Sequence, residues 1–378
     1  MRSSSGSDIS DLEEERKQES SLSISRNRRG LFEESEFDEK PQLFYAEIKN
    51  ITIGEPQKVK EGRDGYFIYP IIEGNTTIAQ HRYKEFVWLR NELSIHYPAC
   101  ATPALPEKEG VIGYWSSQDI LFYKFRRFGL EKFLQRIINH PKLSKSPDLH
   151  SFLKDDDINF HLRMKKSESN KGWYGVISEW STSITSLVSG YISSESNITH
   201  DGGDFEFSNH RNEIKLLYQQ QETLCTQGRN LVTCEENEIA SNIALSKAYE
   251  NMGKVEKDGL SEKLKILAET HQCISDAHKN SFDKLKELVG QEMENCKRIC
   301  FGLLEALERR DKIKSDRNLS SQYDLREINQ DLNKEIIKFN QEKVYLSNLI
   351  SQQLIEYKYE LTEKISEIWR EAYNKLSV

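Results

Sequence analysis

The chain has 378 residues, which is too long for one small domain and suits two or three. Hydrophobic residues make up 37% and charged residues 30%, so we expect part of the chain to be elongated or exposed. No run approaches the ~18 consecutive apolar residues that cross a bilayer, and the first residues lack the apolar stretch of a secretory signal. Integral membrane and secreted proteins are therefore not expected.

The net charge is −8, and residues 41–155 are the only net basic segment, at +3. Duplex nucleic acid normally requires more basic charge than this, so we expect no nucleic-acid partner. A small phosphate or an anionic membrane stays open, because only local charge matters within a Debye length of about 10 Å. The six cysteines lack two pairs at metal-ligand spacing, and we expect reduced thiols, no metal and no cofactor.

The prolines divide the chain. All eight lie before residue 148, and their absence afterwards permits very long helices. We predict a disordered acidic tail over 1–40, a compact domain over 41–155, a linker over 156–203 and a helical domain over 204–378.

The compact domain begins with strand patterns and ends with helix patterns. Residues 43–53 alternate between apolar and polar, 65–72 are aromatic and β-branched, and 76–81 return after a tight turn at 73–75. Helical spacing then starts at Phe86, and a second helix is predicted over 118–139. A last short helix starts at Ser146-Pro147, a good cap followed by a first-turn proline. The prediction is an α+β domain with a three-stranded antiparallel sheet.

Three motifs in this domain have the chemistry of an anion site. They are HRYKEFVWL at 81–89, the stiff segment ATPALPEK at 101–108, and RRFGLEKFLQRIINHPKL at 126–143. Taken singly, each is an ordinary surface. Together, in this order, they resemble the PX (phox-homology) domain over about 41–155. That resemblance implies binding of phosphatidylinositol 3-phosphate, with no catalytic residues.

The resemblance also implies roles for four residues. Arg82 would hold the 3-phosphate, Tyr83 would pack under the inositol, Lys108 would meet the 1-phosphate, and Arg126 would bond the inositol hydroxyls. Arginine suits a phosphate because its planar fork donates two parallel hydrogen bonds. His81 stands where many members carry a basic residue. It either makes binding pH-dependent or is merely the last residue of a strand.

Two apolar stretches predict contact with a bilayer. Large side chains in the loop after Lys108 would insert into it, or pack on the helices instead. Residues 170–192 have one apolar face and would lie in the interface, or dock on a protein. The residues predicted to insert are Val111, Ile112, Trp115, Trp173 and Trp180.

Three long helices are predicted over about 206–251, 260–313 and 325–376, with glycines 253 and 259 bracketing the end of the first. Such rods bury little surface alone and should dimerise. Their position and the segment 335–376 resemble the BAR domain of PX–BAR sorting nexins, which implies an all-α dimeric coiled-coil crescent. An ordinary antiparallel coiled coil is the alternative. In a BAR dimer the basic turn between the last two helices would meet anionic membrane, through Arg309, Arg310, Lys312, Lys314 and Arg317.

These resemblances imply a peripheral protein on the cytosolic face of endosomes. It would bind phosphatidylinositol 3-phosphate and sense or induce curvature in a retromer-type coat for cargo sorting and retrograde transport. Its partners would be a second copy or another sorting nexin, and a cargo complex. A PX–coiled-coil tether that binds the same lipid without bending membranes is the alternative. No phosphate loop, nucleophile elbow or H-E-x-x-H motif occurs, so an enzyme is not expected.

Overall fold

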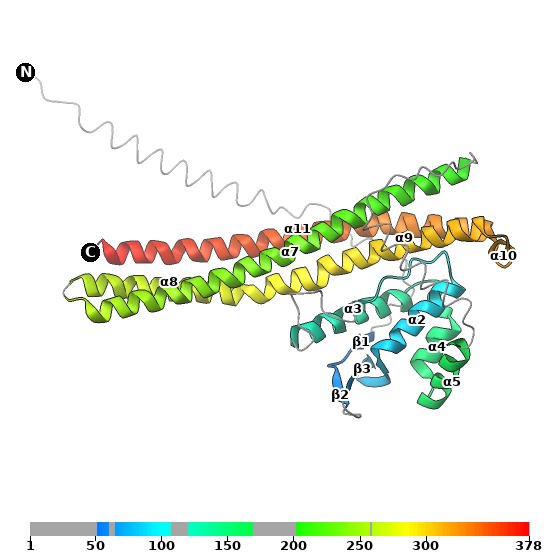
Figure 1. The fold of residues 1–378 in the computed structure, drawn as a ribbon, viewed down its shortest axis with the longest axis horizontal. Coiled ribbons are helices and arrows are strands. Elements are labelled where there is room, and N and C mark those ends of the chain that lie inside the picture. Colours follow the sequence, from blue (N-terminus) through cyan, green and yellow to red (C-terminus); the bar gives the residue numbers. More distant parts are fainter. Residues whose placement is uncertain (1–50, 60–64, 107–119, 169–201, 258, 378) are drawn as a thin grey trace, which may run out of the picture. The chain divides into compact units, whose positions relative to one another are not determined.

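The computed structural model describes residues 51–59, 65–106, 120–168, 202–257 and 259–377. Its described strands form one antiparallel sheet of β1 (Ile51–Ile53), β2 (Gln57–Val59), β3 (Tyr66–Glu73) and β4 (Thr76–Arg82) (Figure 1). β1 and β2 pair in succession with the two ends of β3, so they form one interrupted edge strand. The sheet is therefore the predicted meander with an additional break.

The break in the edge strand lies at Gly54–Pro56. Gly54 still donates its amide to Pro70 O at 2.9 Å, but Pro56 has no amide to continue the ladder. On the other side of β3, the predicted turn to β4 is confirmed. Gly74 occupies the left-handed region there, with a φ of 61°.

The helices that follow are α2 (Tyr83–His96), α3 (Ile120–Ile138), the short η1 (Leu143–Lys145) and α4 (Pro147–Lys154). Ser146 caps α4 by accepting a hydrogen bond from the Asp148 amide at 3.1 Å, as predicted. The core between sheet and helices consists of buried apolar residues from each element, among them Ile53, Tyr69, Phe86, Leu89, Leu130, Phe133, Ile137 and Phe152.

A further helix, α5 (Asp157–Glu168), falls in the segment that the sequence predicts as linker. Its Phe160 and Met164, one turn apart, are buried in the same core. The ring centroid of Phe160 lies 5.1 Å from that of Trp88 on α2. Packing of this compact part therefore continues past residue 155.

The rest of the described chain consists of long helices that pack along one another: α7 (Gly202–Val255), α8 (Gly259–Glu287), α9 (Glu294–Ser315) and α11 (Leu325–Leu376) (Figure 1). At 1.5 Å per residue, α7 and α11 are each about 80 Å long. Gly253 does not end the first helix as predicted. The helix continues to Val255, and the Gly253 carbonyl accepts a hydrogen bond from Ser261 Oγ at 2.6 Å.

The second long helix contains a π-helical segment, η2 (Leu288–Met293), between α8 and α9. At Gly290 in this segment, a Cβ atom would lie 2.9 Å from the ring of Phe125 on α3. The glycine therefore allows α3 to pack directly against the long helix. A single turn, α10 (Arg317–Ser320), separates α9 from α11.

The predicted order, an α+β part with a small antiparallel sheet followed by three long helices, is confirmed. Within the described residues, no helix has both the length and the apolar character that membrane crossing needs. The helical part has its own core, of buried residues on every long helix, among them Ile214, Val232, Leu285, Leu303, Ile336 and Leu361.

Candidate functional site

The site predicted for the headgroup is organised at the corner where β4 ends and α2 begins. Glu85, in the first turn of α2, accepts a hydrogen bond from the Arg82 amide at 2.8 Å. Its Oε2 also lies 3.1 Å from Nδ1 of His81. Burial alone would raise the pKa of Glu85, but these hydrogen bonds more than compensate, and the pKa is lowered. A buried carboxylate thus fixes the backbone of Arg82.

The side chain of Arg82 lies against an aromatic ring. Its Cζ is 3.3 Å from the ring centroid of Tyr66, the first residue of β3. Stacking covers the face of a guanidinium and leaves its orientation defined, with the N–H groups at the edges of the plane. A phosphate is bound through those edges. Tyr66 is a residue of this corner that the sequence did not single out.

Tyr83 follows Arg82 in the chain and contacts Arg126. Its hydroxyl donates to Pro106 O at 2.5 Å, and Cζ of Arg126 lies 5.0 Å from its ring centroid. Arg126 extends from α3 and also lies 4.1 Å from the Phe122 ring. Burial raises the pKa of the nearby Tyr69, and the charge of Arg126 acts against that rise. The structure therefore places Arg126 of α3 against the ring of Tyr83, next to Arg82 in the chain.

His81 is buried in the core beside this corner, so its ring is not presented to a ligand with Arg82. Its ring stacks on Phe152 with centroids 3.9 Å apart, and its Nε2 donates to the Phe152 carbonyl at 2.5 Å. These contacts tie β4 to α4. Of the two interpretations of His81, they favour the residue at the end of a strand, because alternate strand positions point to opposite faces.

Several predicted residues lie outside the described residues. They are Lys108 and the residues expected to insert into a bilayer: Val111, Ile112, Trp115, Trp173 and Trp180. Their assignments stay predictions.

The basic residues at the end of α9 divide into two groups. Arg309 and Arg310 are 1% and 3% exposed, so the expectation that they face a membrane is corrected. Arg310 donates to Asn329 Oδ1 at 3.0 Å, and Arg309 to backbone carbonyls. Lys312 is half-buried, whereas Lys314 and Arg317 are exposed as predicted. Arg309 and Arg310 are adjacent and lie on neighbouring sides of α9 that the rest of the chain covers, where both meet polar partners.

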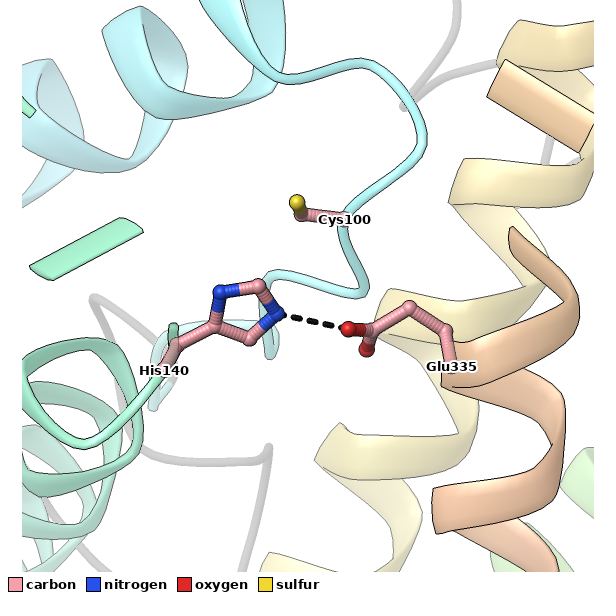
Figure 2. A group of neighbouring side chains, drawn as sticks. All are labelled: Cys100, His140 and Glu335. Atoms are coloured by element: carbon pink, nitrogen blue, oxygen red, sulfur yellow. Dashed lines mark hydrogen bonds and ion pairs between the residues drawn. The ribbon is translucent and has the colours of Figure 1, made fainter. Parts of the chain in front are cut away.

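Cys100, His140 and Glu335 converge on one buried point and have the side chains of a metal centre (Figure 2). His140 Nδ1 accepts hydrogen bonds from the amides of Leu143 at 3.1 Å and Lys142 at 3.2 Å. On the other side of the ring, Nε2 donates to Glu335 Oε1 at 2.6 Å. Both ring nitrogens of His140 thus have protein partners. This group is a buried bridge between the turn after α3 and helix α11.

Comparisons with known proteins agree with this architecture. The family model of the PX domain matches residues 69–156. Sorting nexin 1 of Arabidopsis thaliana is 34% identical over 116 residues, which are 29% of this chain and 28% of that protein. Sorting nexin-1 of Rattus norvegicus is 26% identical over 282 residues, which are 66% of this chain and 52% of that protein. The chain thus matches about half or less of these relatives' length.

A solved structure, the cryo-EM structure of the SNX-BAR Mvp1 tetramer, superposes with a TM-score of 0.58 at 17% identity. The superposition covers 85% of this chain and 99% of that one, so it includes both the sheet domain and the long helices. At 17% sequence identity, this superposition establishes the fold alone. Residues 69–156 thus match the PX-domain family model, the chain is similar to sorting nexins, and its long helices share the fold of the SNX-BAR structure.

Proposed function

We propose that this chain binds phosphatidylinositol 3-phosphate on the cytosolic face of endosomes through Arg82, Tyr83, Lys108 and Arg126. The main support is the placement of two guanidinium groups against aromatic rings: Cζ of Arg82 lies 3.3 Å from the Tyr66 ring centroid, and Cζ of Arg126 lies 5.0 Å from that of Tyr83, the residue after Arg82. Two guanidinium groups held by aromatic rings suit a ligand that carries a phosphate and adjacent hydroxyls. An arginine on the hydroxyl side leaves little space for further phosphates, which favours the monophosphate.

The same proposal assigns the long helices to a dimer that senses or induces curvature. An apolar stripe along α11 supports it, because its members are at least 45% exposed and recur at spacings of 4, 7, 10 and 11 residues. The stripe consists of Ile337, Val344, Ile355, Tyr359, Trp369 and Tyr373. A second copy or another sorting nexin would cover this face.

At the end of α9 and the start of α10, anionic lipid would be met by Lys312, Lys314 and Arg317. Dimerisation would double the number of these cations. Headgroup binding and curvature binding on one scaffold would reinforce each other without either being tight. Assembled on tubules, the dimers would act in cargo sorting and retrograde transport as a retromer-type coat. The function proposed is thus membrane binding and shaping, without catalysis.

Pelleting with liposomes tests the headgroup site. Arg82→Ala should abolish the selective binding of liposomes that contain phosphatidylinositol 3-phosphate over liposomes that lack it. Lys84→Ala is the matched control, since it removes the same charge from an exposed position two residues away. Selective pelleting of the Arg82→Ala variant at the wild-type level would refute the site.

Negative-stain electron microscopy of the same liposomes tests the curvature assignment. Narrow tubules with a regular protein coat would support it for the chain as a homo-oligomer. Vesicles that are decorated but stay round would favour a tether. A repeat with an added sorting nexin partner would then separate the tether from a heterodimer.

A further inference from the structure

The segment that connects α2 to the predicted lysine loop is held by the helical part of the chain. Over residues 98–106, Ala104 donates its amide to the carbonyl of Arg298 on α9 at 3.2 Å. Arg309, about three turns further along α9, donates Nε to Pro98 O and Nη2 to Cys100 O, each at 3.0 Å. This segment has neither helical nor strand structure of its own, so helix α9 supplies hydrogen bonds that secondary structure would otherwise supply.

The approach of the segment to α9 is as close as a backbone allows. At Gly302, a Cβ atom would lie 2.4 Å from Thr102 O and 2.8 Å from Thr102 C. Both atoms belong to the main chain, so a side chain at position 302 would have to push the whole segment away. Glycine is thus required here for contact between two backbones.

A buried network of charged side chains also stabilises the contact between residues 98–106 and α9. Glu305 lies between two guanidinium groups, with Oε2 2.5 Å from Nη2 of Arg90 on α2 and 3.1 Å from Nη1 of Arg309 on α9. Arg90 also donates Nε to Pro103 O at 2.8 Å. Removing one member of such a network leaves a buried charge without compensation. The network therefore favours this one arrangement of α2, α9 and residues 98–106.

Residues 98–106 end at the headgroup corner. Pro106, its last described residue, accepts the hydrogen bond from Tyr83 Oη at 2.5 Å. On its other side, Pro106 packs on α3, where a Cβ at Gly129 would lie 3.1 Å from it. Gly129 is one turn from Arg126. The position of Pro106 therefore constrains the two helices that carry the predicted headgroup residues.

We infer that helix α9 is a positioning element of the headgroup site: through Gly302 and Arg309 it holds residues 98–106, and through Pro106 it sets the place of Tyr83. The inference deepens the proposed function and rests on it. It makes the inositol phosphate affinity of the sheet domain depend on residues of the membrane-shaping domain that do not touch the lipid. By linkage, a bound headgroup stabilises the contact with α9 to the same extent.

Calorimetric titration of the full chain with soluble inositol 1,3-bisphosphate tests this inference without vesicles or curvature. Gly302→Ala should weaken this affinity about tenfold, a common size for coupling between sites. The control, Leu264→Ala, removes a buried side chain from α8 and destabilises the helical part without a contact to residues 98–106. It should lower the melting temperature and leave the affinity unchanged.

Arg309→Lys is the second variant, in case Gly302→Ala does not fold. It keeps the charge but loses the planar fork, and should weaken the affinity less than Gly302→Ala does. In a double-mutant cycle, Gly302→Ala and Tyr83→Phe should be non-additive, because both act through Pro106.

The outcomes separate this inference from the proposed function. Unchanged affinity in a folded Gly302→Ala variant, or an equal loss in Leu264→Ala, would overturn the inference. Additive effects in the cycle would overturn the route through Pro106. If the Arg82→Ala variant also binds with wild-type affinity, the headgroup site itself is wrong. If Arg82→Ala loses affinity and Gly302→Ala does not, the headgroup site stands and only the role of α9 is rejected.

Discussion

Arg309 Nε donates a hydrogen bond to the carbonyl oxygen of Pro98 at 3.0 Å, although 211 positions separate the two residues in the chain. The guanidinium is fully buried, with Glu305 as its charged partner. A cation in such a place is costly unless a charged partner and hydrogen bonds compensate for the lost hydration. Here Nε and Nη2 are hydrogen-bonded and, among the described residues, Nη1 makes only the ion pair with Glu305. Arg309 therefore acts as a buried connection between α9 and the segment after α2.

Replacing Arg309 by methionine should lower the stability of the chain. The change keeps the volume but leaves the carbonyls of Pro98 and Cys100 without this donor, and leaves Glu305 with one guanidinium in place of two. Loss of one partner from a buried pair typically costs about 3–5 kcal/mol. Urea unfolding followed by circular dichroism should show a clearly lower midpoint.

Arg326→Met is the control for this measurement, since Arg326 is exposed near the start of α11. It should change stability by less than about 0.5 kcal/mol. Equal midpoints for the Arg309 and Arg326 variants would mean that the buried network contributes no net stability.

The inward position of Arg309 shows where sequence reasoning reached its limit. The basic run at the end of α9 is visible in the sequence, but its spacing places charges on every side of a helix. Which side is buried depends on residues 98–106, a partner more than two hundred positions away. The same applies to Glu335, whose buried contact with His140 no local pattern indicates.

Where the signal is local, the prediction held. Ser146 and Pro147 fix the start of α4 through a cap that can be read directly from the sequence. The absence of proline after residue 147 predicts the long helices. The corner at Arg82 and Tyr83 followed from a family resemblance, while Tyr66 was missed because a ring at the start of a strand carries no motif. The burial of Phe160 was not predicted, because a single apolar turn in an otherwise polar helix gives only a weak helical periodicity.

The apolar stripe on α11 should be an interface. Ile355→Glu together with Tyr373→Glu would place two charges on it, at positions that are 69% and 72% exposed in one chain. Burying an unpaired carboxylate opposes association, so the variant should be monomeric by light scattering coupled to size-exclusion chromatography. Because both side chains are exposed in the single chain, its helicity should stay unchanged.

Lys364→Glu provides the matched control for the stripe. Lys364 is exposed on the opposite side of α11, so the substitution adds a negative charge without touching the apolar face. It should associate as the wild type does. A dimeric Ile355→Glu/Tyr373→Glu variant would remove this face from the proposed interface.

The accessible cations at the end of α9 and the start of α10 should attract anionic membrane. Changing Lys312, Lys314 and Arg317 to alanine should weaken binding to phosphatidylserine vesicles by about 1 kcal/mol per residue at low salt, and less at high salt. Affinity for soluble inositol 1,3-bisphosphate should not change. Vesicle sedimentation at two ionic strengths measures the first effect, and calorimetry the second.

A variant with Lys254, Lys257 and Lys263 changed to alanine controls for net charge. It removes three exposed cations near the turn between α7 and α8. It should bind these vesicles more tightly than the Lys312/Lys314/Arg317 variant. Equal losses would mean that total charge, rather than the end of α9, governs the attraction.

The carboxylate at the headgroup corner should make stability depend on acid pH. The pKa of Glu85 is below its ordinary value of 4.5. Burial raises this pKa, but the hydrogen bonds from His81 and the Arg82 amide lower it by more than burial raises it. The folded state therefore binds fewer protons than the unfolded chain near this pH. The stabilisation is complete above about pH 4.5 and is lost as the pH falls through the folded pKa.

Glu85→Gln isolates this contribution from that of the other carboxylates. The variant should melt at a lower temperature than wild type at pH 7, since a neutral amide accepts weaker hydrogen bonds than a carboxylate. Between pH 6 and about pH 3 its melting temperature should fall less steeply, because one group that takes up a proton on unfolding has been removed. Two melting curves that run parallel over this range would show that the Glu85 carboxylate is not what holds the Arg82 corner together.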